Sequence, residues 1–160
     1  MTVPPLPDDP AILKAREALF EQARNWPLFH LIGMELEDVR PAWSMLKIAW
    51  RPDLTQPAQI MHGGIIATLI DTGIAHAILL TDARYTEGSL SVVSVDLRVK
   101  YLRPVSSGVI YCESTVPRIG KQVIHADSVV RNEEGKVVAR GDAIYMVVTR
   151  DRLQRDEAGA

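Results

Sequence analysis

The fold of this chain is decided by the stretch Met61-His62-Gly63-Gly64-Ile65-Ile66-Ala67-Thr68-Leu69-Ile70-Asp71-Thr72. It begins with a His-Gly-Gly turn and continues as an almost uniformly apolar helix, which we expect over about residues 63–80. A helix that is apolar on most of its faces is a buried helix, so a sheet must cover it. Asp71 is the only carboxylate in the quoted stretch. A buried aspartate nearly always has a hydrogen-bond or ion-pair partner or a catalytic role. Asp71 is therefore the first candidate for a catalytic residue.

Length and composition bound the class of protein. The chain has 160 residues, of which 47% are apolar and 24% charged, so we expect residues 1–160 to form a single soluble domain with flexible tails at 1–9 and 150–160. The net charge of −2 argues against nucleic acid as a partner. Cys112 is the only cysteine, which excludes an internal disulfide and favours the cytoplasm. The N-terminus does not resemble a signal peptide, and the apolar 65–80 stretch is too short to span a membrane.

The remaining patterns predict one more helix and a set of antiparallel strands. Asp9 followed by Pro10 is a helix start, and apolar residues at helical spacing predict an amphipathic helix over about 10–25 that Trp26-Pro27 ends. Alternating residues predict extended structure over 33–50, 93–101, 109–116, 122–131 and 136–149. We expect loops at 51–60 and 81–88. This order predicts an α+β fold, in which a curved antiparallel sheet wraps one long central helix and an extra N-terminal helix is added.

Two features of the central helix favour chemistry when they are taken together. The Gly63-Gly64 pair could expose unpaired N–H groups to an oxyanion, or it could simply make a tight turn. Asp71 could be a base or nucleophile, or a structural carboxylate bonded to Thr68 or to a loop. Gly64 and Asp71 are seven residues apart and lie on roughly the same helix face. We therefore expect the N–H groups and the carboxylate to border one groove.

Other polar residues carry weaker signals. His62 could donate to a substrate carbonyl or hold its loop. Ser94 lies in a predicted strand without a Gly-x-Ser-x-Gly turn, which favours an ordinary polar strand position. Arg118 and the Gly120-Lys121 turn could meet a phosphate or could only be solvated. No two histidines have the spacing of zinc ligands together with a carboxylate as the third ligand, so we expect no metal.

The motif spacing resembles that of a known family. Over about residues 45–148, the chain is similar to the hotdog-fold acyl-CoA thioesterases of the PaaI-like (phenylacetate-pathway) group, in the elements Gln56-x5-His62-Gly63-Gly64-x6-Asp71, Ser94-Val95-Asp96-Leu97 and Tyr101-x-Arg103-Pro104. The resemblance implies the hotdog fold and hydrolysis of an aryl or medium-chain acyl-CoA to the free acid and coenzyme A. It implies no cofactor, because coenzyme A is part of the substrate.

The resemblance also implies roles for individual residues. The Gly63 N–H would polarise the thioester carbonyl, and Asp71 would act as general base or nucleophile. Gln56 would orient the carbonyl or the water, Ser94 would lie near that water, and His62 would support the loop or bond to the thioester. Further substrate-binding positions would be Gly64, Thr72, Gly120 and Lys121. Of these, Lys121 is the candidate for contacting the coenzyme A phosphates.

The resemblance further implies a site shared within a homodimer or homotetramer. Gln56 and Gly63 would come from one protomer, and Asp71 and Ser94 from the other. Two departures from the family pattern are Gln59, where many members have glycine, and a slightly long 81–88 loop, which we expect to reshape the acyl pocket. The alternative function is a non-catalytic acyl-CoA or lipid-binding hotdog dimer, which would not need the carboxylate or Gln56. A hotdog hydratase would carry a different Asp/His pair on a short helix, and the sequence lacks one.

Overall fold

The N-terminal part of the chain forms two consecutive helices. The computed structural model describes residues 3–151. Of the tails expected at 1–9 and 150–160, residues 1–2 and 152–160 therefore lie outside the described residues. Helix α1 (Pro10–Asn25) begins where the sequence predicts: the Asp9 carboxylate accepts a hydrogen bond from the Ala11 N–H at 2.8 Å. Helix α2 (Pro27–Ile32) was not predicted. Pro27 does end α1, but proline also suits the first position of a helix, and here it starts the next one.

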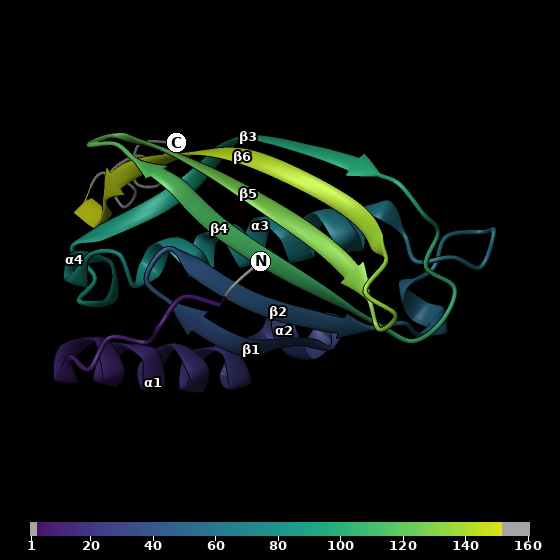
Figure 1. Cartoon of the computed structure of the whole chain (residues 1–160), viewed down its shortest axis with the longest axis horizontal. Coiled ribbons are helices and arrows are strands. Elements are labelled where there is room, and N and C mark those ends of the chain that lie inside the picture. Colours follow the sequence, from purple (N-terminus) through teal and green to yellow (C-terminus); the bar gives the residue numbers. More distant parts are fainter. Residues whose placement is uncertain (1–2, 152–160) are drawn as a thin grey trace.

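Six strands form one antiparallel sheet, which confirms the predicted α+β architecture. The strands are β1 (Met34–Arg40), β2 (Trp43–Ala49), β3 (Leu90–Tyr101), β4 (Val109–Ile119), β5 (Val123–Asn132) and β6 (Val137–Thr149). Their order in the sheet is β1-β2-β4-β5-β6-β3, so β3 crosses over to pair with the last strand. Figure 1 shows the sheet curving around the central helix, with α1 and α2 beside β1.

The central helix is α3 (Gly63–Leu79), and it packs into the concave face of the sheet. Leu69, Ile70 and Ile74 on this helix are fully buried. Gly73 brings the helix close to β4, because an added Cβ would lie only 2.6 Å from Ser114 Oγ. The Ser44 hydroxyl of β2 donates to the Gly73 carbonyl oxygen at 2.7 Å and fixes the helix to the sheet.

The segments expected to be loops contain two short helices. The 3-10 helix η1 (Pro52–Leu54) lies in the first, and α4 (Ala83–Thr86) lies in the second. Asp82 starts α4 by accepting from the Arg84 N–H at 3.0 Å, and Tyr85 anchors the helix with 7% of its surface exposed. A four-residue helix is too short to show hydrophobic periodicity, so the pattern could not predict it.

The two edge strands of the sheet, β1 and β3, differ in what covers them. The Arg16 guanidinium of α1 bonds to Asp38 Oδ1 at 2.6 Å and to the Val39 carbonyl at 3.1 Å, so α1 covers the β1 side. Among residues 3–151, the other edge strand, β3, pairs only with β6. A bulge interrupts that pairing between Ser94 and Asp96. Within the same residues, none of the helices combines the length and apolar character of a membrane span.

Candidate active site

The start of α3 leaves one backbone donor free. His62 is the N-cap, and its Nδ1 accepts the Gly64 N–H at 2.9 Å. His62 thus supports the turn, and the Gly64 N–H expected to meet substrate is already occupied. The Gly63 N–H has no acceptor within residues 3–151. This N–H lies at the positive end of the helix dipole, so it is the donor available to an oxyanion.

Tyr101 explains why position 63 is glycine. The Tyr101 hydroxyl, at the end of β3, donates to the Gly63 carbonyl oxygen at 3.0 Å. A Cβ on Gly63 would lie 3.1 Å from the Tyr101 Cζ atom, so the Tyr101 ring would have to shift to admit a side chain there. Gly63 and Tyr101 line a cavity of about 410 Å³ together with Gln56 and Arg103. Arg103 is the cation of this cavity, and its Nη1 donates to the Val137 carbonyl at 2.5 Å.

Gln56 is positioned by its own loop. Its Oε1 accepts the Ala58 N–H at 2.8 Å, which orients the side chain and leaves the amide NH2 group to donate. Gln59 adopts φ of +60°, a left-handed conformation that glycine prefers. The loop therefore keeps the backbone conformation that glycine favours, although a glutamine stands there.

Asp71 is held by a residue that the sequence patterns did not single out. The Tyr145 hydroxyl of β6 lies 2.5 Å from Asp71 Oδ1 and 2.7 Å from the Asp71 carbonyl oxygen. Burial raises the pKa of Tyr145 strongly, and the neighbouring Asp71 carboxylate raises it further. The phenol thus stays protonated and acts as a donor. The expected structural partner, Thr68, instead donates to the Gly64 carbonyl at 2.9 Å.

Ser94 belongs to the same cluster as Asp71. It faces Tyr145 directly in the pairing of β3 with β6. Because the β3 bulge follows Ser94 immediately, the register change lies next to the cluster. From the sequence, Tyr145 is placed only within the predicted strand over 136–149.

A second cavity, of about 450 Å³, opens beside Asp71 between α1, α3 and α4. Its wall along α3 is formed by Asp71, Thr72, Ala75, His76 and Leu79. The Nδ1 atom of His76 lies 2.8 Å from the Thr72 carbonyl, so it is the protonated nitrogen. Burial lowers the pKa of His76, which keeps the imidazole neutral. The cavity thus combines apolar side chains such as Leu79 with polar ones, and the Asp71 carboxylate lies at its border.

Within one chain, Gly63 and Asp71 do not border one groove, so that expectation is wrong. Gly63 lines the first cavity and Asp71 lines the second. The two residues share a helix face, but they are about 12 Å apart along the axis. The carbonyl oxygen must reach the Gly63 N–H while the carbonyl carbon lies within about 3 Å of a water held by Asp71, and the two residues of one chain line different cavities.

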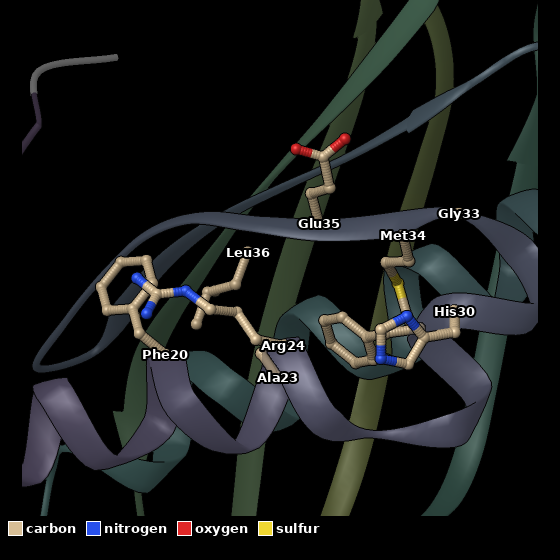
Figure 2. A pocket seen from close by; sticks show the side chains of 9 residues that line it. Phe20, Ala23, Arg24, His30, Gly33, Met34, Glu35 and Leu36 are labelled. Atoms are coloured by element: carbon tan, nitrogen blue, oxygen red, sulfur yellow. The ribbon is translucent and has the colours of Figure 1, made fainter.

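Two further places lie apart from the Gly63 and Asp71 cavities of the same chain. Gly120 and Lys121 lie at the hairpin between β4 and β5, where the Gly120 N–H donates to the Val123 carbonyl at 2.9 Å, and they line neither cavity. A third cavity of about 440 Å³ lies between α1, α2 and β1 (Figure 2). It contains none of the residues that the sequence singles out, and Glu35 points away from the other labelled side chains. The Glu35 carboxylate instead pairs with Lys47 at 3.1 Å.

Comparison with known proteins points to one family. The family model described as "Thioesterase superfamily" matches residues 58–139, just over half of the chain. The medium/long-chain acyl-CoA thioesterase YigI of Escherichia coli is 29% identical over 152 residues, which cover 86% of this chain and 98% of YigI. A thioesterase of Haemophilus influenzae superposes with a TM-score of 0.74 at 25% identity, over 84% of this chain and 90% of its own. The PaaI protein of E. coli has the same TM-score at 20% identity, over 86% of this chain and 94% of PaaI, and shares the fold.

Proposed function

This chain belongs to the thioesterase superfamily and is a thioester hydrolase, and we propose that it hydrolyses an acyl-CoA to the free acid and coenzyme A. The predicted hotdog fold is confirmed by the same comparisons. The observation that carries the substrate proposal is that one helix supplies a free N–H to one cavity and a carboxylate to a second cavity.

The proposed chemistry uses these two groups in turn. Asp71 removes a proton from a water molecule, whose oxygen attacks the thioester carbon. The Gly63 N–H donates to the carbonyl oxygen as negative charge develops on it. The carbonyl then re-forms, the C–S bond breaks, and the leaving thiolate takes up the proton that Asp71 removed from the water, which regenerates the Asp71 carboxylate. A general base of this kind contributes about 100-fold to 10,000-fold in rate.

We propose that each site is shared between two protomers. Gly63 and Asp71 are too far apart in one chain to act on one carbonyl, so each needs its counterpart from a second copy. The free edge of β3 offers the place for that copy, because an unpaired edge strand is a template for another strand. The proposal is a homodimer whose sheet continues across β3 and whose Gly63 cavity faces the partner's Asp71 cavity.

The cavity beside Asp71 suits the acyl group. Its α3 wall, from Asp71 to Leu79, is about 12 Å long, and this length suits a chain of medium length. The name of the E. coli relative YigI, a medium/long-chain acyl-CoA thioesterase, agrees with such a substrate. Arg103, on the Gly63 side, is the proposed contact for a coenzyme A phosphate.

The function is tested by thiol release from a panel of alkyl- and aryl-CoA esters. We expect turnover to peak at a medium chain length and to disappear in Asp71→Asn. A panel without turnover, together with tight binding of acyl-CoA, would instead identify a non-catalytic acyl-CoA carrier.

The shared site has its own test, which combines two inactive variants. A heterodimer of Gly63→Val and Asp71→Asn protomers has one doubly defective site and one intact site. When equal amounts are co-expressed, half the dimers are mixed and about a quarter of all sites are intact. We expect activity to return to about that fraction; two variants that remain inactive together would contradict a shared site.

A further inference from the structure

The orientation of the Asp71 carboxylate is set by a residue 74 positions later in the chain. Tyr145 lies on β6 with only 2% of its surface exposed, so its ring is fixed by the packing of the sheet. Its hydroxyl reaches up to α3 and contacts both the side chain and the carbonyl of Asp71. Among residues 3–151, Asp71 Oδ2 has no hydrogen-bond partner. One carboxylate oxygen is therefore held, and the other is left open.

The Tyr145 hydroxyl has one proton and two acceptors. An ionised carboxylate is a stronger acceptor than a carbonyl, so the proton points to Oδ1 while Asp71 is charged. After Asp71 has taken a proton from water, the phenol can turn to the Asp71 carbonyl oxygen, 2.7 Å away. The buried hydroxyl thus stays paired in both states, and the cost of leaving it unpaired is avoided.

We propose that Tyr145 is a positioning residue for the hydrolysis: it fixes the Asp71 side chain, leaves Oδ2 to bind the attacking water, and switches acceptors as Asp71 gains a proton. This inference rests on the proposed function. Ser94 is a neighbour of this pair, because it faces Tyr145 across the strand pairing.

Other ionisable groups border the same cavity and must be separated from this effect. They are His76 on α3, Tyr85 on α4 and Arg150 just after β6, whereas α1 contributes only uncharged side chains. Burial raises the pKa of Tyr85, and arginine stays charged, so neither titrates on the acid side. His76 does, because burial lowers its pKa.

The decisive variant is Tyr145→Phe, which keeps the ring and removes the donor. We expect kcat to fall about tenfold or more and KM to change little. The same loss of kcat is expected in a His76→Leu background. Tyr111→Phe, on the outer face of β4, is the matched control and should leave kcat unchanged.

A ring-fluorinated tyrosine at position 145 tests the opposite direction and preserves packing. The phenol becomes a stronger donor and still holds Asp71, so kcat should be retained. An unchanged kcat in Tyr145→Phe, or an equal further loss in an Asp71→Asn background, would overturn the role of Tyr145. If the wild type releases no thiol from any acyl-CoA, the proposed function itself fails, whereas full activity in Asp71→Asn refutes the catalytic role of Asp71. An inactive Asp71→Asn beside a normal Tyr145→Phe rejects only the positioning role.

Discussion

The start and the middle of α3 supply the two polar groups of the proposed site in opposite ways. At Gly63 the group is a backbone N–H, free because the chain enters a helix there and because the His62 ring occupies only the next N–H. At Asp71 the group is a side chain, and a phenol from β6 holds it. The donor at the helix start is therefore available because Gly63 has no side chain. The carboxylate in the middle of the helix is instead held by Tyr145, a residue distant in the sequence.

This contrast predicts which substitutions damage chemistry and which damage the fold. A change at Gly63 introduces atoms against Tyr101, so it disturbs geometry as well as catalysis. A change of charge at Asp71 leaves the volume and the packing almost untouched. The predictions below test the contrast, starting with the largest expected effect.

The largest effect is expected for Asp71→Asn. The amide is nearly isosteric and can still accept from Tyr145, but it cannot act as a base, so kcat should fall about 100-fold or more. The melting temperature should be unchanged or slightly higher, because a partly buried charge has been removed. Melting temperature and thiol release are measured on the same sample. A variant that melts early and turns over normally while folded would make Asp71 purely structural.

Gly63→Val should come next. Valine keeps the backbone N–H, but its side chain would block the approach of the carbonyl oxygen to it. Losing one oxyanion donor in this way costs about 3 kcal/mol of transition-state stabilisation, which is roughly 100-fold in rate. The added side chain meets the Tyr101 ring at the helix start, so the melting temperature should fall as well, unlike that of Asp71→Asn. Circular dichroism gives the folded fraction, and Tyr101→Phe shows the effect of the phenol alone. Normal turnover in a folded Gly63→Val protein would remove the N–H from the mechanism.

A smaller effect is expected from Ala75→Phe, which fills the cavity beside Asp71. The value of kcat/KM should fall about tenfold or more for the best medium-chain substrate and change little for acetyl-CoA, since each lost methylene contact is worth about 1–3 kcal/mol. Ala49→Phe, at the exposed end of β2, is the control. An unchanged chain-length profile in Ala75→Phe would place the acyl group elsewhere.

The smallest effect concerns His76 and the pH dependence of stability. Its pKa in the folded protein lies below the unfolded value of 6.5, so the unfolded chain binds the proton more readily. The stability is fully present above pH 6.5 and is lost as the pH falls toward the folded-state pKa. Between pH 7 and 5.5, the free energy of unfolding should drop by about 1 kcal/mol. Urea unfolding should show this drop in the wild type and in His30→Gln, but not in His76→Leu.

Local patterns in the sequence predicted most of the architecture. The apolar run after Gly64 predicts the buried helix, and alternation predicts the strands to within a few residues of their observed ends. Helices α2 and α4 were missed because they have six and four residues and depend on single starting residues, Pro27 and Asp82. Hydrophobic periodicity can be recognised only over several helical turns, so it cannot predict helices as short as these.

The sequence by itself determined that a carboxylate lies in a buried helix that starts with glycines, because composition and spacing are local properties. Only the tertiary structure decided which groups surround that carboxylate. Tyr145 reaches Asp71 because β6 lies under α3 in one register, and a shift of a single residue would turn the phenol to the opposite face of the sheet. The separation of the Gly63 and Asp71 cavities was likewise decided in three dimensions, by the helix rise and by the elements that enclose each cavity.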